Sequence, residues 1–243
     1  MRLAASLILV VAGHAAAGTV AVVADRDATL IEDPDGAAAS GAGPLLFVGR
    51  TNFTDNGVRR GLVRFDLAGT LPPGGAHVLE GVTVVLTNLI SANTTPREFR
   101  LHRVLAGWGE GASASAGGGG APAQPGDATW IHAFYSDAFW LHNGGQFDGE
   151  PSARLIVAGP GVYRFEDPKL DRDVALWAAN PELNFGWMLI GDETVRQTAR
   201  AFGSRENPEP GARPVLEVTF RGPARFYGHA FPEAAISGSR EPD

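Results

Sequence analysis

Apolar and polar residues alternate with a period of two in several segments of the chain. The clearest segment contains Val63, Phe65 and Leu67, which are separated by Arg64 and Asp66. Successive side chains of a β-strand point to opposite faces, so this alternation predicts strands with one buried face. The segments predicted as strands are 19–24, 29–32, 45–49, 63–67, 78–89, 98–102, 154–158, 186–190 and 216–220.

Two segments depart from this alternation. The stretch 186–190 is apolar throughout, which is typical of a central strand covered on both faces. Leu170, Val174 and Trp177 are spaced by four and three residues, and this spacing predicts one short helix over 171–179.

The segments between the predicted strands contain many turn-forming residues, as in Asp33–Gly36 and Asn207–Gly211. Many short strands joined by such turns, with a single helix, predict an all-β fold, an antiparallel and jelly-roll-like β-sandwich. Gly111–Gly126 consists mainly of Gly, Ala, Ser and Pro, so we expect a flexible loop insertion there, with a domain boundary as the alternative.

The N-terminus has the features of a signal peptide. Arg2 is followed by the apolar run Leu3–Gly13 and by Ala15 and Ala17, small residues in a pattern that signal peptidase accepts. A membrane anchor is the alternative, but the run is shorter than the roughly 20 residues that span a bilayer. We expect a secreted, cell-surface or periplasmic protein without a membrane span after signal removal. Its predicted parts are a signal peptide (1–17), one β-sandwich domain (18–220) and an irregular, disordered tail (221–243).

The composition argues against several classes of function. The chain has 27 acidic and 20 basic residues and a formal net charge of −7, which is unlike nucleic-acid-binding proteins. Cys is absent, so the fold has no disulfide and no cysteine nucleophile. The sequence also lacks a His-Glu-x-x-His motif and a Gly-x-Ser-x-Gly elbow. We therefore predict a protein that is not an enzyme.

Several motifs resemble those of a known family. The segment Arg60–Leu67 is an Arg-containing strand that ends in Phe-Asp-Leu. It is followed by Leu71–Val78, in which a Leu-Pro-Pro-Gly-Gly turn leads into a long strand. This arrangement resembles the opening of DNRLRE domains. Later landmarks follow in the same order, so that the resemblance extends from about Ala24 to Phe220: Trp108–Glu110, Asp127–Trp130, Asn184–Glu193, Phe202–Glu206 and Arg213–Phe220. The resemblance implies an extracellular β-sandwich related to carbohydrate-binding modules.

The segment 130–142 is the best candidate for a recognition loop, because it contains several aromatic residues and two histidines. Trp140 and Tyr135 could stack on a ligand while His142 and Asp137 form hydrogen bonds with its hydroxyl groups. The alternative is a long loop that covers one end of the sandwich. Of the other tryptophans, we expect Trp177 and Trp187 in the core and Trp108 and Trp130 as anchors of the Gly-rich loop.

Acidic residues gather near the first predicted strands. Asp25, Asp27, Asp33 and Asp35 offer the hard oxygen ligands that Ca²⁺ prefers, so a structural calcium ion is one interpretation. The other is a solvated acidic turn, because the spacing lacks most of an EF-hand pattern. A second charged group, Glu193 with Arg205 and Glu206, predicts an ion-pair network between strand ends, with a clamp for acidic sugars as the alternative.

Together these features predict a secreted, non-catalytic β-sandwich module that binds polysaccharide or cell-surface matrix. Two alternatives stay open, a glycan-active lyase or hydrolase and a purely structural surface protein. No nucleic-acid partner is expected.

Overall fold

The computed structural model describes residues 17–68 and 78–221. Its strands pair throughout as antiparallel neighbours and form an all-β sandwich with one α-helix, which confirms the predicted fold class. The predicted signal peptide, the turn at Leu71–Gly75 and the predicted C-terminal tail fall almost wholly outside the described residues. Among the described residues, no helix combines the length and the apolar character needed to cross a bilayer.

One sheet is organised around the long strand β6. This 14-residue strand pairs with β12 along one edge and with both β15 and β14 along the other. The sheet contains β1 (Ala17–Val23), β4 (Leu45–Arg50), β6 (Val78–Ser91), β12 (Gly161–Glu166), β14 (Arg200–Gly203) and β15 (Val215–Arg221).

The second sheet has β5 and β13 at its centre and joins the first sheet through β4. The first residues of β4 pair with β14, whereas Gly49 and Arg50 pair with β5. The sheet contains β2 (Arg26–Ile31), β3 (Ala38–Ser40), β5 (Val58–Arg64), β7 (Arg97–Arg103), β8 (Ala121–Pro122), β11 (Ala153–Val157) and β13 (Trp187–Ile190). A separate hairpin is formed by β9 (His132–Phe134) and β10 (Ala138–Phe139).

The predicted helix is present as α1 (Pro168–Ala179), beginning three residues before the predicted start. The Asp167 side chain accepts a hydrogen bond from the Lys169 amide at 2.8 Å and caps the first turn. Proline tolerates the first helical position because its missing N–H would have no partner there. The short 3₁₀ helices η1 (Pro181–Leu183) and η2 (Pro210–Ala212) complete the described helices.

The main core lies between the two sheets and against α1. Trp177 and Trp187 are buried there, with ring centroids 4.5 Å apart, which confirms the predicted place of both indoles. Leu170 and Val174 lie on the same buried side of the helix as Trp177. Burial of these large apolar side chains is the main favourable contribution to folding in a chain without disulfides.

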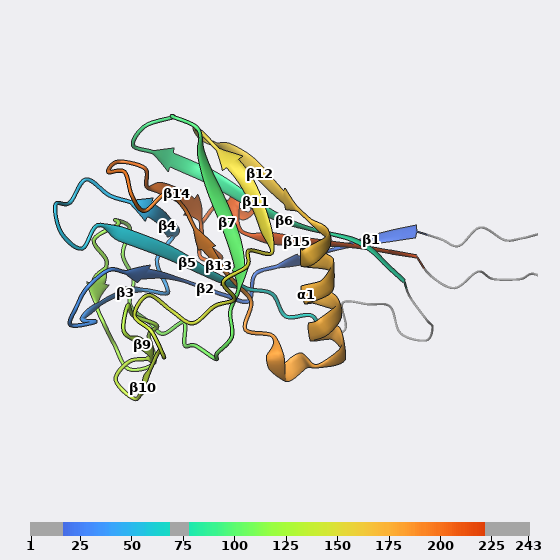
Figure 1. Cartoon of the computed structure of the whole chain (residues 1–243), viewed down its shortest axis with the longest axis horizontal. Coiled ribbons are helices and arrows are strands. Elements are labelled where there is room, and N and C mark those ends of the chain that lie inside the picture. The colour runs from blue at the N-terminus through green and yellow to red at the C-terminus, as the bar shows by residue number, and fades with distance from the viewer. Residues whose placement is uncertain (1–16, 69–77, 222–243) are drawn as a thin grey trace, which may run out of the picture.

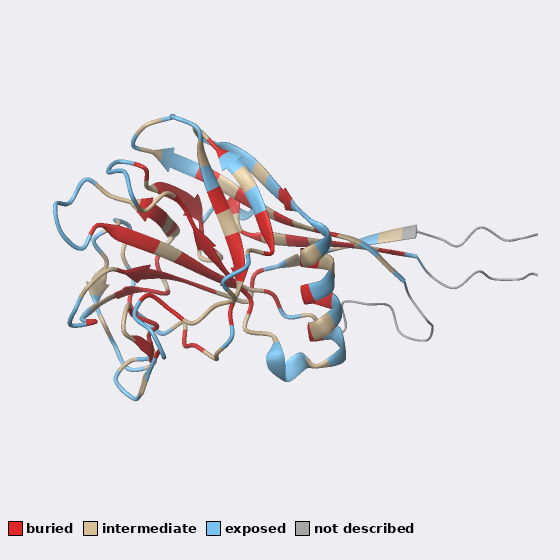
Figure 2. Ribbon diagram, viewed as in Figure 1, coloured by how far each residue is buried: buried red, intermediate tan, exposed pale blue. Residues whose placement is uncertain are grey.

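A second cluster lies on the outer face of the second sheet. Met188, Ile190 and Leu62 pack there against Trp108 and Trp140, which come from the long connection after β7. All four residues of β13 are therefore buried, as the continuous apolar pattern predicted. Figure 2 shows the central strands buried along most of their length. The connection thus covers the outer face of this sheet, whereas the alternative interpretation of segment 130–142 predicted a loop over one end of the sandwich.

The Gly-rich stretch 111–126 has specific hydrogen-bond partners, although its composition predicted a flexible insertion. The Ser113 carbonyl accepts from the amides of Gly41 and Ala42 at 3.0 and 2.8 Å. Further along, β8 pairs with β3, and the buried Arg59 donates to the Gly118 carbonyl. Backbone groups provide these contacts, so counting apolar side chains could not reveal them.

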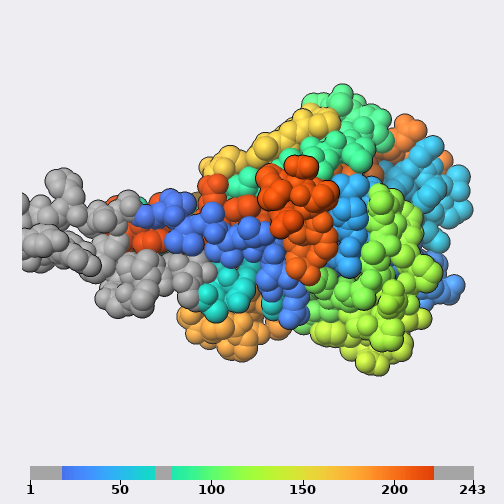
Figure 3. All heavy atoms as spheres, turned by 180° about the vertical axis from the view of Figure 1, so that it is seen from behind, coloured from blue at the N-terminus to red at the C-terminus, as the bar shows by residue number. Residues whose placement is uncertain are grey.

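The molecule is elongated, and its two ends are different. Ala17 at the start of β1 pairs with Arg221 at the end of β15, so both strands leave the sandwich at the same end. Figure 1 shows this pair at one end of the long axis and the β9–β10 hairpin towards the other. The space-filling view from behind shows the same narrow extension, with the chain around residues 110–140 gathered at the broad end (Figure 3).

Candidate functional site

The candidate recognition loop forms the β9–β10 hairpin and its flanks on the outer side of the second sheet. Ala138 pairs with Phe134, and the register then shifts so that Phe139 pairs with His132. Trp140 is only 6% exposed, and its Nε1 donates to the Thr129 carbonyl at 2.9 Å. The prediction that Trp140 stacks on a ligand is therefore corrected, because a buried indole has no face available to one.

Three aromatic rings lie together beside Trp140. The Phe139 ring lies 4.5 Å from the His132 ring at an interplanar angle of 33°, and the Tyr135 ring meets His132 edge-on at 5.0 Å. Phe139 is 68% exposed, whereas His132 is buried. We call Tyr135, His132 and Phe139 the aromatic platform. Its outermost ring, Phe139, packs on one side and is exposed to solvent on the other.

Local hydrogen bonds hold the central ring of the platform. The Thr129 hydroxyl lies 3.0 Å from His132 Nδ1 and accepts from the His132 amide at the same distance. Burial lowers the pKa of His132, so its imidazole is neutral at neutral pH. The His132 ring therefore has a fixed position under Phe139 and carries no charge.

The predicted polar residues lie at the edges of the same hairpin. Asp137 is exposed in the turn, where its amide donates to the Phe134 carbonyl at 2.8 Å. His142 is exposed two residues after Trp140. Tyr135 and Asp137 therefore belong to the hairpin that carries Phe139, and His142 is exposed three residues after Phe139. Phe139, and not Trp140, is the exposed ring of this pair.

Arg60 supports this region from the underlying sheet. Its guanidinium lies 4.9 Å from the Trp130 ring centroid and donates from Nη1 to the Gly144 carbonyl at 2.7 Å. It also forms two hydrogen bonds with Glu193, at 2.7 and 3.0 Å. Glu193 is therefore paired with Arg60 and does not belong to the predicted network with Arg205.

The four aspartates proposed as calcium ligands do not form one site. Asp25 lies just before β2 and is paired with Arg64, while Asp27 is buried within β2. Asp33 lies beyond the far end of β2, where its carboxylate accepts from the amides of Asp35 and Ala37 at 3.1 and 2.9 Å. Asp35 is exposed in that turn. The calcium prediction is corrected in this respect, because sequence proximity did not bring the carboxylates together.

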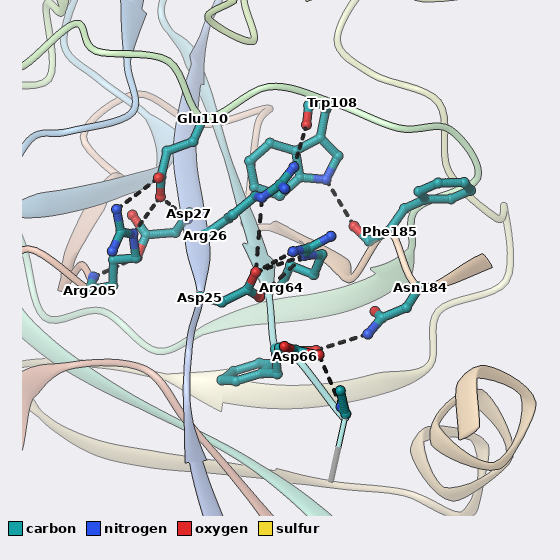
Figure 4. A network of polar contacts seen from close by, with 12 residues as sticks. Asp25, Arg26, Asp27, Arg64, Asp66, Trp108, Glu110, Asn184, Phe185 and Arg205 are labelled. Carbon is teal, nitrogen blue, oxygen red and sulfur yellow. Dashed lines mark hydrogen bonds and ion pairs between the residues drawn. The ribbon is translucent and has the colours of Figure 1, made fainter. Parts of the chain in front are cut away.

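Asp27 instead belongs to a different acidic group. Among the described residues, one group of three potential metal ligands occurs, in which oxygens of Asp27, Glu110 and Glu206 lie within 4.8 Å of one another. Arg205 donates to both Glu110 oxygens at 2.7 and 2.9 Å (Figure 4). Arg205 also lies 2.8 Å from Glu206. The Asp27 carboxylate accepts from the Arg205 amide at 2.6 Å.

The charges in this group are only partly balanced, since one guanidinium faces three carboxyl groups. Burial raises the pKa of Asp27 well above its usual range, and the neighbouring Glu206 and Glu110 raise it further. The hydrogen bond from the Arg205 amide lowers this pKa but does not cancel the effect of burial. Burial also raises the pKa of Glu206. The group could share a proton or hold a cation, and Arg205 already supplies one positive charge. Glu110 was missed from the sequence because it lies far along the chain from β2.

A cavity of about 610 Å³ lies between α1 and the sandwich. Most of its lining is apolar, from residues such as Leu79, Ala178 and Val218, with polar exceptions at Arg64, Asp66 and Asn184. Such a lining suits a hydroxyl-rich ligand poorly, because buried hydroxyl groups need hydrogen-bond partners. The exposed aromatic platform is therefore the better candidate site for a sugar.

The sequence predicted a ligand-stacking role for Trp140, which is buried, and did not single out the exposed Phe139. Phe139 could have been found from strand alternation, since neighbouring residues point to opposite faces and the larger Trp140 fills the interior. No family model matches the chain, and the search of curated proteins found no match.

Proposed function

We propose that this chain is a secreted, non-catalytic module of the DNRLRE type that binds polysaccharide through the aromatic platform. The observation that carries this proposal is the Phe139 ring, which is 68% exposed yet held at 4.5 Å from the buried His132 ring. Contiguous exposed apolar patches are typical of interaction sites, and Leu141, two residues after Phe139 in the same segment, is 71% exposed.

The chemistry of the platform suits a sugar ring. A pyranose has an apolar face of C–H groups that can pack on an aromatic ring, and hydroxyl groups around its edge. The exposed Asp137 carboxylate can accept hydrogen bonds from hydroxyls, while the His142 imidazole can donate or accept. The Tyr135 hydroxyl adds a third polar group next to an apolar surface.

The position of the platform is also suitable for a polymer. It lies towards the end of the molecule opposite the paired β1 and β15 (Figure 1). A polysaccharide can therefore extend across the hairpin without meeting those strand ends. An exposed surface of this kind favours internal segments of a chain over a short enclosed ligand.

The test is retention of the purified protein on a panel of insoluble and immobilised polysaccharides, using Phe139→Ala. We expect this substitution to weaken retention about tenfold, equivalent to roughly 1.4 kcal/mol, without a change in melting temperature. The matched control is Phe53→Ala, which removes another exposed phenylalanine, 55% exposed, from a different loop. Equal retention of the Phe139 and Phe53 variants would contradict the proposal.

The same incubation separates binding from catalysis. Retention without shortening of the polymer supports a binding module, whereas new reducing ends or unsaturated sugar products support the alternative glycan-active enzyme. A protein that neither binds nor cleaves any polymer in the panel would have a purely structural role.

A further inference from the structure

The turn Asp33–Gly36 packs directly against the aromatic platform. A Cβ at Gly36 would lie 2.4 Å from Ile131 Cγ1 and 3.0 Å from His132 Nδ1, so only glycine allows this close approach. The positive φ of 62° at Gly36 independently favours glycine. Although β2 and β9 are far apart in sequence, the turn after β2 therefore borders the platform.

This contact brings further carboxylates to the edge of the platform. Asp35 is exposed in the turn, and Asp137 is exposed between β9 and β10. Asp33 is partly buried and accepts hydrogen bonds from amides of its own turn. One exposed carboxylate, Asp35, thus lies next to the glycine that contacts His132, and another, Asp137, lies two residues before Phe139.

Positive charge does not balance these carboxylates. Arg60 is paired with Glu193 and lies beneath Trp130 with 16% of its side chain exposed. His132 is buried and neutral. Within 130–147, all of which the structure describes, His142 is the one exposed basic side chain. The net charge of −7 for the whole chain acts in the same direction.

We infer that the platform selects polysaccharides with protonated amino groups over polymers with carboxylate or sulfate groups. This inference rests on the proposed function and adds the charge class of the ligand. An ammonium group on a sugar whose ring packs on Phe139 would lie beside the Asp35 and Asp137 carboxylates. A uronate in the same place would be repelled by both. Each such exposed contact contributes modestly, but a polymer repeats it along its length.

The experiment compares three polymers of similar length on immobilised supports: poly-glucosamine, its N-acetylated form and a polyuronate. At a mildly acidic pH and low salt, we expect about fivefold tighter binding of the amino form than of the acetylated form, and weakest binding of the polyuronate. Salt should reduce this preference, because exposed charges are screened within about 10 Å at 0.1 M ionic strength.

The variants separate the charge from the aromatic contact. The double substitution Asp35→Asn and Asp137→Asn should abolish the preference for the amino polymer, so that the amino and acetylated polymers bind equally. Asparagine keeps an oxygen acceptor for sugar hydroxyls, so binding of the acetylated polymer should fall less than binding of the amino polymer. The matched control neutralises two exposed carboxylates elsewhere, with Glu98→Gln and Glu166→Gln, and should keep the preference. Phe139→Ala should weaken binding of every polymer.

Each outcome bears on one proposal or on both. If the amino and acetylated polymers bind equally, and Phe139→Ala removes the binding of both, the charge inference is overturned and the proposed function stays intact. If Phe139→Ala still binds the amino polymer, the polymer is attracted by the net negative charge of the whole protein. That result would overturn the inference. Absence of binding to any polymer, or retention on neutral lipid vesicles instead, would overturn both.

Discussion

At the scale of single residues, Phe139 and Trp140 show how two neighbours in the sequence can differ in burial. Phe139 is 68% exposed and lies on His132, whereas Trp140 is 6% exposed and fills the cluster beneath the hairpin. Tryptophan is the larger apolar side chain, so its burial contributes more to the fold. The smaller ring, Phe139, is exposed and is therefore the one that we propose to contact a ligand.

Trp140→Phe tests this assignment. The substitution removes the Nε1 donor from the Thr129 carbonyl and leaves unfilled volume in the cluster. We expect the free energy of unfolding to fall by roughly 1–3 kcal/mol, as measured by chemical denaturation. Polysaccharide retention should stay unchanged at temperatures where the variant is folded. Lost retention with unchanged stability would mean that Trp140, and not Phe139, contacts the ligand.

At the scale of elements, the Gly-rich stretch shows how order can arise without apolar side chains. Arg59 is 2% exposed and donates to the carbonyls of Val58 and Asn56 at 2.7 and 2.8 Å, and also to that of Gly118. Burial lowers the pKa of Arg59 to about 10, with Glu32 acting in the opposite direction, so the guanidinium remains charged at neutral pH. A single charged donor therefore joins β5 to the connection that follows β7.

Arg59→Met should release this connection. The methionine keeps much of the side-chain volume but cannot donate to the Gly118 carbonyl, so we expect amide hydrogen exchange in 113–122 to become at least tenfold faster. Exchange in β6 and β15 should stay slow. Arg164→Met is the control, since Arg164 pairs with Glu217 on the other sheet. Fast exchange of 113–122 in the unmodified protein would instead support the flexible insertion that the composition predicted.

At the scale of the whole molecule, buried charge makes stability depend on pH. The carboxyl groups of Asp27 and Glu206 have raised pKa values in the folded state, chiefly because of burial. When the pKa of a carboxyl group is higher in the folded than in the unfolded state, its protonation stabilises the fold. This contribution is fully present below the unfolded pKa of about 4. This contribution is lost as pH rises through the folded pKa. Ionisation of these groups therefore opposes folding at neutral pH.

Asp27→Asn should relieve this effect. Asparagine retains an acceptor for the Arg205 amide and carries no charge, so we expect the melting temperature to rise by a few degrees at neutral pH. The gain should shrink as pH falls towards about 4, where the aspartate is itself protonated. Arg205→Ala is the opposite variant and should lower the melting temperature at neutral pH, because three carboxyl groups would lose their guanidinium. A pH-independent effect of Asp27→Asn would contradict the assignment.

The sequence by itself determined the fold class, most of the strands, the helix and the burial of Trp177 and Trp187. These features follow from periodicity and turn chemistry, which act between residues close together in the chain. It proposed 130–142 as a recognition segment without identifying its exposed ring, and it grouped Asp25, Asp27, Asp33 and Asp35 by proximity in sequence. Only the tertiary structure decided that Asp27 meets Glu110 and Glu206, that Phe139 is exposed and that the Asp33–Gly36 turn borders the platform. Exposure and charge pairing depend on which distant segments pack together, and local sequence patterns carry no information about that packing.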